Sequence, residues 1–289
     1  MKEPLFTGVC TALVTPFRDN LINYQMVAKL LDYQLDAGVS AIVIAGTTGE
    51  SATLTDLEKI QLFRYCKEYV KDRCLIIAGT GSNNTEHSVR LSITAEECGV
   101  DALLVVSPYY NKATAEGIYR HYQAICEAVS IPVIVYNVPG RTGLDIPVDV
   151  YQRLSEIPNV AGVKEANPDI TKITKIRNRC GKDFPVWTGN DDEIVPVLAM
   201  GGVGVISVLS NVKPVECVAL CRAAISGDYI TASNIQCAYA ELIDALFCEV
   251  NPVPVKAAMK IIGFDCGECR LPLCEPADAT YTRLKNLIQ

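Results

Sequence analysis

Short, apolar, β-rich runs recur along the first three quarters of this chain, and amphipathic segments of helical period separate them. The runs are apolar throughout rather than alternating, which is typical of strands that are buried on both faces. This alternation of strand and helix predicts parallel βαβ units, and about eight units are the number that a closed barrel needs. The predicted strands are residues 9–15, 41–46, 75–79, 102–106, 133–136, 160–164, 186–189 and 203–208. The predicted helices are residues 24–37, 56–71, 86–98, 115–128, 147–154, 169–179, 191–200 and 214–226.

The positions of the polar residues distinguish a closed barrel from an open sheet, which would give a similar pattern. In an open sheet, functional residues gather at one switch point, whereas in a barrel they follow many strands. Polar residues follow nearly every predicted strand here, among them Thr47, Tyr110 and Lys164. We therefore expect an α/β fold, a (β/α)8 TIM barrel over residues 1–226. A C-terminal helical extension over residues 227–289 is expected to hold helices at 230–246, 255–262 and 279–288.

The charge of the chain bears on its partners and its location. A net charge of −7 and a pI near 5.0 argue against nucleic acid or an anionic membrane surface as a partner. The most apolar stretch, residues 194–209, is broken by Pro196 and by glycines and is too short for a membrane span. The N-terminus carries Glu3 and no long apolar run, so we expect no signal peptide. These features predict a cytoplasmic protein.

The 13 cysteines are scattered and odd in number, which argues against a secreted disulfide framework. Cys98, Cys126, Cys221 and Cys237 fall in helical patterns. We interpret them as small buried hydrophobic residues.

A metal centre is not expected. The one metal-like spacing is the pair of cysteines at residues 266–269, which has no histidine nearby and no second pair. The only two histidines, His87 and His121, both fall in predicted helices. A zinc centre with three histidines is therefore excluded, and a Ser-His-Asp triad is disfavoured.

Lys164 ends the sixth predicted strand, so its side chain is expected to emerge from the barrel interior. A lysine amine attacks a carbonyl only when it is neutral, and an apolar barrel mouth favours the neutral form by desolvation. Tyr136 ends the preceding strand, so its phenol can lie beside Lys164 and shuttle protons. The alternatives are a lysine that extends to solvent from a strand end and a tyrosine that fills the core.

Two further segments have donors that suit anionic groups. Residues 46–50 (Gly-Thr-Thr-Gly-Glu) form a tight loop with free amides and two hydroxyls, which suits a carboxylate. A simple turn with a helix cap is the alternative for this loop. Arg141 can hold a second anionic substrate through two parallel hydrogen bonds, or it can form a surface salt bridge instead.

Together these residues resemble the pyruvate-dependent aldolase family that includes dihydrodipicolinate synthase and N-acetylneuraminate lyase. The resemblance extends over nearly the whole chain. Its motifs are TALVTPF (11–17), GTTGESATL (46–54), IAGTGSN (77–83), SPYYNK (107–112), YNVPGRTG (136–143), GVKEA (162–166), TGNDD (188–192), GVGVISV (202–208) and NPVPVKA (251–257). The loop at 46–50 and the strand lysine are shared by the wider family. The Tyr-Tyr-Asn run and the arginine of YNVPGRTG are more specific to the synthase.

The resemblance implies a lyase that condenses pyruvate with L-aspartate 4-semialdehyde in diaminopimelate and lysine biosynthesis. It implies that Lys164 forms a Schiff base with pyruvate, and that the resulting enamine attacks the aldehyde. The implied proton relay comprises Tyr136, Thr47 and Tyr110, with Tyr110 reaching into the site of a neighbouring subunit.

The resemblance also implies how the substrates are held. Thr48 is implied to bind the pyruvate carboxylate and Arg141 to receive aspartate semialdehyde, while the backbone at Gly189 and Ile206 lines the pocket. No metal or organic cofactor is implied, because the lysine itself is the electron sink. The implied assembly is a homotetramer built as a dimer of dimers.

In relatives that lysine inhibits, lysine binds in a pocket at the dimer interface. The matching positions here are Ser51, Ala52, Lys59, Asn83, His87 and Tyr109. The sensitive relatives usually have a histidine or another non-basic residue in place of Lys59 and a glutamate in place of His87. We therefore expect weak inhibition by lysine, or none. Asp56 is a partial compensation, because it stands where sensitive enzymes often have histidine.

Two other functions remain open on the sequence. A pyruvate-lysine aldolase acting on a sugar acid, as N-acetylneuraminate lyase does, would keep Thr47, Tyr136 and Lys164 but have less use for Arg141. A small-molecule sensor on a barrel scaffold would keep the lysine only as a structural residue. Such a sensor would form no imine with pyruvate.

Overall fold

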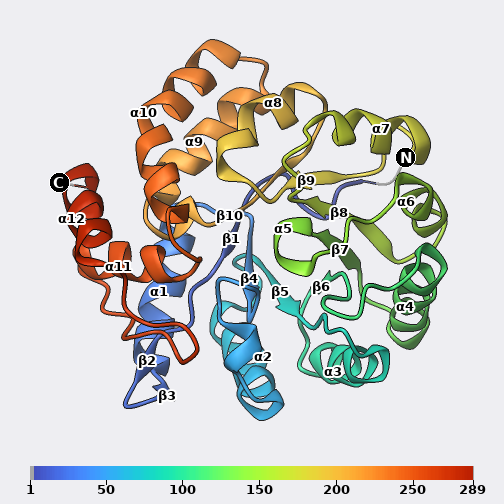
Figure 1. Ribbon diagram of the computed structural model, residues 1–289, viewed down its shortest axis with the longest axis horizontal. Coiled ribbons are helices and arrows are strands. Elements are labelled where there is room, and N and C mark those ends of the chain that lie inside the picture. Colours follow the sequence, from blue (N-terminus) through green and yellow to red (C-terminus); the bar gives the residue numbers. More distant parts are fainter. Residues whose placement is uncertain (1–2, 289) are drawn as a thin grey trace.

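Eight parallel strands close into a barrel in the computed structural model, which describes residues 3–288 (Figure 1). Around the barrel the strand order is β1-β10-β9-β8-β7-β6-β5-β4, so each strand pairs with its neighbours in sequence and β1 closes the ring. The strands are β1 (Gly8–Ala12), β4 (Ala41–Ile44), β5 (Leu75–Gly79), β6 (Ala102–Val106), β7 (Val133–Asn137), β8 (Val160–Glu165), β9 (Val186–Thr188) and β10 (Gly204–Ser207). The predicted TIM barrel is confirmed.

The helices form an outer ring around these strands (Figure 1). The helices of the barrel region, residues 1–226, are α1 (Tyr24–Asp36), α2 (Asp56–Val70), α3 (Thr85–Glu97), α4 (Ala115–Ala128), α5 (Pro139–Thr142), α6 (Val148–Ser155), α7 (Thr171–Cys180), α8 (Ile194–Ala199) and α9 (Pro214–Ile225). Several begin at side chains that accept a hydrogen bond from a free amide of the first turn. Thr55 and Glu58, for example, form a reciprocal capping box at the start of α2.

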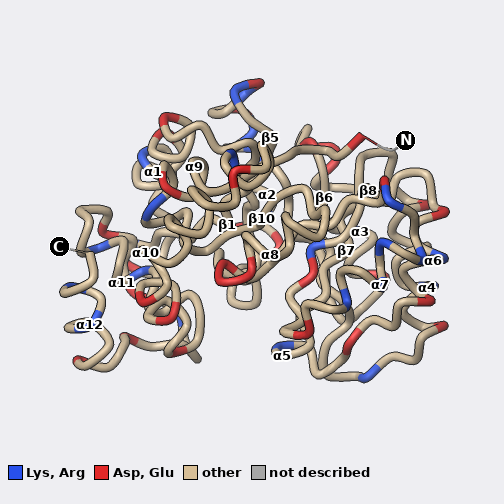
Figure 2. The backbone as a smooth tube through the Cα atoms, turned by 90° about the horizontal axis from the view of Figure 1, so that it is seen from above, with Lys and Arg blue, Asp and Glu red and all other residues tan. Residues whose placement is uncertain are grey.

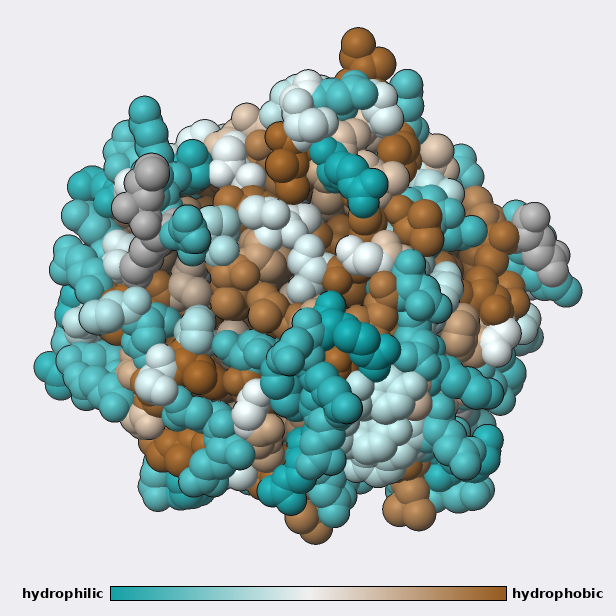
Figure 3. Space-filling view, turned by 180° about the vertical axis from the view of Figure 1, so that it is seen from behind, coloured by the Kyte–Doolittle hydropathy of each residue, from teal (hydrophilic) through white to brown (hydrophobic). Residues whose placement is uncertain are grey.

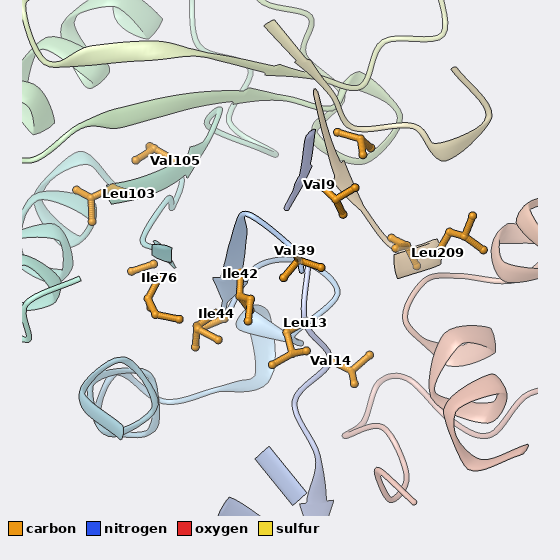
Figure 4. Packing of buried hydrophobic residues seen from close by; sticks show 14 of the residues in the cluster. Val9, Leu13, Val14, Val39, Ile42, Ile44, Ile76, Leu103, Val105 and Leu209 are labelled. Atoms are coloured by element: carbon orange, nitrogen blue, oxygen red, sulfur yellow. The ribbon is translucent and has the colours of Figure 1, made fainter. Parts of the chain in front are cut away.

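Strand side chains alternate between two apolar layers. On β4, Ile42 and Ile44 point outward and pack against the helices (Figure 4). Ala41 and Val43 alternate with them and belong to the layer inside the barrel. The outer layer is the larger one and lies between the strands and the ring of helices. The same alternation decides which residues of β7 and β8 reach the barrel interior.

The barrel interior is closed at the N-terminal end of the strands. The ring of Phe6 stacks on that of Trp187 with 4.8 Å between centroids, and Trp187 Nε1 donates to the carbonyl of Phe6 at 3.2 Å. Figure 3 shows apolar side chains gathered in the middle of the face behind the view of Figure 1, with polar side chains around them. A polar site in the barrel can therefore lie only at the opposite end, where the strands finish.

Some predicted boundaries were wrong, and local contacts explain the differences. The first strand was predicted to run to residue 15 but ends at Ala12, because the Val14 amide donates to the Asn211 side chain instead of to a neighbouring strand. The predicted helix 191–200 is a 3-10 turn, Asp191–Glu193, followed by α8. Pro196 has no amide hydrogen and so falls in the first turn of α8, where no donor is needed.

Several short elements were not predicted. They are the antiparallel hairpin of β2 (Phe17–Arg18) and β3 (Leu21–Ile22), the 3-10 turns Ser51–Thr53 and Leu209–Asn211, and α5. All are shorter than the windows in which an apolar period can be recognised.

Beyond residue 227 the described chain forms the three predicted helices, α10 (Tyr229–Phe247), α11 (Val253–Ile261) and α12 (Asp278–Ile288), with a non-helical segment between α11 and α12. These helices lie on one side of the barrel, where α10 packs on α8 and α9 (Figure 1). The division into two regions at residue 227 stays a prediction. Within residues 3–288 no helix has the length and apolarity needed to cross a membrane.

Candidate active site

Lys164 and Tyr136 face each other inside the C-terminal end of the barrel. They are register partners on the adjacent strands β8 and β7, and both are nearly buried, at 5% and 6% exposure. The Lys164 amine lies 4.2 Å from the centroid of the Tyr136 ring. A nearly buried primary amine against a phenol is an arrangement that can form an imine and move its protons.

Asn137 and Glu165, the residues that follow Tyr136 and Lys164, hold β7 and β8 together from outside the barrel. Asn137 and Glu165 point outward, and Asn137 Nδ2 donates to Glu165 at 2.7 Å. Tyr151 donates to the other oxygen of Glu165 at 2.9 Å, and Lys172 lies 3.6 Å from it. Burial raises the pKa of Glu165, and the charge of Lys172 opposes that rise. These contacts fix the register that brings Tyr136 to Lys164.

Gly189, at the end of β9, gives the Lys164 side chain its space. A Cβ atom at residue 189 would lie 2.8 Å from Lys164 Cε, so any other residue would displace the lysine. The Gly189 amide donates to the carbonyl of Glu165 at 2.7 Å, which ties β9 to β8 at this level. Ile206 is fully buried on β10, in the same interior layer as Tyr136.

The loop after β4 places Thr47 and Thr48 at the same end of the barrel. Two of its amides are engaged within the loop, since Glu50 donates to Thr47 and Ser51 to Gly46. Thr48 is buried, and its hydroxyl accepts a hydrogen bond from Asn251 Nδ2 at 3.0 Å. The side-chain oxygen of Asn251 is buried and has no partner among the described residues.

Arg141, on α5, is the predicted cation that the structure places at the barrel mouth. Its guanidinium Nη2 donates to the carbonyl of Asn251 at 3.1 Å. Asn251 therefore contacts both Thr48 and Arg141, from a position between α10 and α11. No pattern in the sequence indicated this role, although Asn251 begins the motif NPVPVKA.

A cavity of about 540 Å³ opens beside these residues and is lined by Thr47, Tyr136, Arg141 and Asn251. Lys164 reaches the ring of Tyr136 from the barrel interior and does not itself line the cavity. The cavity is thus adjacent to the amine through Tyr136.

Most of the residues assigned to the effector pocket line the same cavity. They are Ser51, Ala52, Lys59, His87 and Tyr109, whereas Asn83 lies outside the lining and accepts a hydrogen bond from Asn111 at 3.0 Å. His87 Nε2 lies 2.9 Å from both oxygens of Asp56. Lys59 is 7% exposed, and burial lowers its pKa, although the charge of Asp56 opposes that shift.

Tyr110 is placed differently from the other predicted site residues. Its side chain is 89% exposed, and its backbone has a φ of 72°, which is a strained value for a residue of this size. Strain of this kind is found most often at active sites, ligand clamps and switch regions. Within one chain the structure does not bring Tyr110 to Lys164.

Asp191 is a buried carboxyl near the site that the sequence did not single out. One of its oxygens accepts the amides of Val208 and Leu209, both at 2.9 Å, and the other is buried without a partner among the described residues. Burial raises its pKa, while hydrogen bonds and the charge of Lys164 oppose that rise. Its signals in the sequence are its position two residues after Gly189 and its place in the motif TGNDD.

The prediction that the helical cysteines are buried was wrong for Cys237, which is exposed on α10, and only half correct for Cys98, which is partly buried. Cys126 and Cys221 are buried as expected.

Among residues 3–288 no group of three or more His, Cys, Asp or Glu side chains is arranged to hold a metal ion. Figure 2 shows Lys and Arg interspersed with Asp and Glu around the molecule.

Comparison with known proteins gives matches over the whole chain. The Dihydrodipicolinate synthetase family matches residues 5–289. The 4-hydroxy-tetrahydrodipicolinate synthase of Acetivibrio thermocellus is 45% identical over 289 residues, which cover 100% of this chain and 98% of the relative.

Solved structures agree with this match. A dihydrodipicolinate synthase from Thermotoga maritima has a TM-score of 0.96 at 42% identity, with 98% of each chain covered. The same enzyme from Cyanidioschyzon merolae, solved with lysine bound, has a TM-score of 0.96 at 37% identity, with 99% of this chain and 98% of that chain covered.

Proposed function

The chain belongs to the dihydrodipicolinate synthetase family, and on that premise we propose that it joins pyruvate to L-aspartate 4-semialdehyde through an imine on Lys164. Its activity is that of a lyase, the 4-hydroxy-tetrahydrodipicolinate synthase of lysine and diaminopimelate biosynthesis. The observation that carries the assignment of Lys164 is its nearly buried amine, 4.2 Å from the centroid of the Tyr136 ring.

The proposed steps balance without a redox partner. The amine of Lys164 adds to the pyruvate carbonyl, and the carbinolamine loses water to give an iminium ion. Loss of a methyl proton gives the enamine, whose carbon attacks the aldehyde of the second substrate. The amino group of the semialdehyde then attacks the iminium carbon of the adduct, which closes the ring and releases the Lys164 amine for the next cycle.

Within this sequence each side chain has a proposed role. Tyr136 and Thr47, both at the cavity, pass protons to and from the carbinolamine oxygen, with Tyr110 as the outer member of the relay. Thr48 binds the pyruvate carboxylate, and the backbone of Gly189 and Ile206 bounds the pocket. Arg141 binds the carboxylate of the semialdehyde.

Replacement of Arg141 by alanine tests the second substrate. Loss of a charge-assisted contact costs about 1.5–3 kcal/mol, so kcat/KM for aspartate semialdehyde should fall by roughly 10- to 150-fold, chiefly through KM. Reduction of the pyruvate imine by borohydride should keep its rate. Steady-state assays with each substrate varied in turn measure the two effects.

The control is Arg120→Ala, because Arg120 forms an exposed pair with Glu116 on α4. This variant should retain wild-type kinetics. A sugar aldehyde such as N-acetylmannosamine serves as the competing acceptor. If the wild-type chain used it better than aspartate semialdehyde, the sugar-acid aldolase would replace the synthase as the assignment.

A homotetramer built as a dimer of dimers is our proposal for the assembly. Tyr109 and Tyr110 are exposed side by side in sequence after β6, and tyrosines are favoured at interfaces. In the proposed dimer Tyr110 completes the proton relay of the neighbouring subunit. This arrangement accounts for its exposure and strained backbone within one chain.

Mixed oligomers test whether Tyr110 acts across subunits. Chains with Tyr110→Phe and chains with Lys164→Ala, each impaired alone, should form mixed assemblies with higher activity than either parent. The reason is that some sites then combine an intact Lys164 with an intact Tyr110 from the neighbour. Mixtures of Lys164→Ala with Lys164→Arg are the control and should stay inactive. Absence of any gain from the first mixture would place Tyr110 in the site of its own chain.

Regulation and location complete the proposal. The relative from Cyanidioschyzon merolae was solved with lysine bound, and we propose that the matching pocket here contains Ser51, Ala52, Lys59, His87 and Tyr109. We propose that this pocket binds lysine weakly or not at all. We also propose that the protein works in the cytoplasm and needs no metal or organic cofactor.

A further inference from the structure

A buried ion pair joins the loop that carries Thr47 and Thr48 to the C-terminal region. Glu50 ends the Gly-Thr-Thr-Gly-Glu segment, and its side chain is fully buried. Lys256 of α11, whose side chain is 3% exposed, donates to one carboxylate oxygen of Glu50 at 2.8 Å. The backbone amide of Arg270 donates to the other oxygen at 2.8 Å. Both oxygens of this loop residue are thus held by the C-terminal region.

The backbone of Glu50 explains why the loop needs such a hold. Glu50 has φ 56° and ψ 37°, a left-handed conformation that residues other than glycine rarely adopt. Strained residues of this kind persist only where their surroundings fix them. The turn at Glu50 directs the chain into the 3-10 turn Ser51–Thr53, so its geometry also sets the direction of the Thr47-Thr48 segment before it.

The C-terminal partner is itself fixed on the barrel. The Phe17 amide of β2 donates to the carbonyl of Cys266 at 2.9 Å. Lys256 Nζ and Arg270 Cζ lie 4.5 Å and 4.3 Å from the centroid of the Phe17 ring. Figure 1 shows the chain after α11 running beside the β2–β3 hairpin. Arg270 also donates to Glu58 of α2 and to the carbonyl of Thr53, at the far end of the same loop.

We propose that the Glu50–Lys256 pair is a positioning device of the active site, by which the C-terminal region sets the place of Thr47 and Thr48 opposite Lys164. Asn251, from the same region, holds the Thr48 hydroxyl directly at 3.0 Å. Glu50 and Lys256 do not touch the substrates; they act through the loop. The inference rests on the proposed roles of the two threonines in the pyruvate half of the reaction.

The test replaces both charges, Glu50→Gln with Lys256→Met, because removal of one alone would leave the other buried and unpaired. In the folded variant the rate at which pyruvate and borohydride modify Lys164, called the trapping rate below, should fall by about 10- to 100-fold. A displacement of about 1 Å in a site has effects of this size. The KM for aspartate semialdehyde should change by less than about twofold, because Arg141 is not in the loop. Circular dichroism and thermal melting measure folding separately.

The matched control is Lys67→Met with Asp101→Asn. That pair is also joined at 2.7 Å and partly buried, but it lies between α2 and the start of β6, away from the loop. The control should lower the melting temperature and leave the trapping rate unchanged. If the Glu50/Lys256 variant behaves like the control, the pair is only structural and the proposal is overturned.

A second variant decides the matter if the first does not fold. Glu50→Gln with Lys256→Gln replaces the ion pair by two neutral side chains that can still hydrogen-bond to each other, so no charge is left unpaired. It should slow trapping in the same direction, and a wild-type trapping rate in this variant would overturn the proposal. Failure of the wild-type chain to be trapped at all would instead refute the imine on Lys164, so the two failures are distinguishable.

Discussion

The Lys164→Ala chain is expected to fold and to lose turnover by about 10,000-fold or more, which is the scale of losing a covalent nucleophile. The same substitution should abolish the modification of the chain by pyruvate and borohydride, which in the wild type should add one group per chain. The physical reason is that Lys164 is the amine nearly buried against Tyr136, and without it the site has no group to form the imine. Intact-protein mass and peptide mapping locate the modified residue.

Folding of this variant follows from how β8 is held. The strand pairs with β7 over its length and with β9 at its end, and the outward contacts of Glu165 do not involve Lys164. Lys164→Arg is the control that keeps a long basic side chain, and it should be equally unable to form an imine. Modification of the wild type at Lys256, or nowhere, would refute the mechanism.

The fold was predictable because its determinants are local. A strand that is buried on both faces must be apolar throughout, and a helix that covers it must be amphipathic. The alternation of strands and helices is therefore visible in the sequence. Lys164 and Tyr136 were predictable for the same reason, since each ends one of these strands. The boundaries were less so, as at Val14, whose amide bonds to a side chain 197 residues away.

Contacts between distant segments were what the sequence could not indicate. Asn251 reaches Thr48 across 203 residues, and Lys256 reaches Glu50 across 206. No period or spacing connects such positions. The left-handed backbone of Glu50 was equally hidden, because glutamate is not a residue that signals this conformation. Cys237 was misjudged because α10 packs along one side only, and this residue lies on its exposed face.

Lysine at millimolar concentration is expected to inhibit the wild type weakly or not at all, because the proposed effector pocket already holds a cation. Lys59 is 7% exposed beside the cavity. A second ammonium group about 4 Å away would be repelled by roughly 4 kcal/mol at an effective dielectric constant near 20. Repulsion of this size weakens binding about a thousandfold.

Asp56 does not remove this penalty, because its carboxylate is already engaged. Both of its oxygens lie 2.9 Å from His87 Nε2, and its charge also acts on Lys59. Lys59→His with His87→Glu should therefore create inhibition, since the pair removes the cation and adds a carboxylate for the ammonium group of lysine. Arg90→Glu, which makes the same change of charge at an exposed position of α3, should create none. Steady-state assays at increasing lysine measure all three chains. Half-inhibition of the wild type below about 1 mM would contradict the prediction. It would show that lysine does not bind next to Lys59, because the repulsion between the two cations would not allow that affinity.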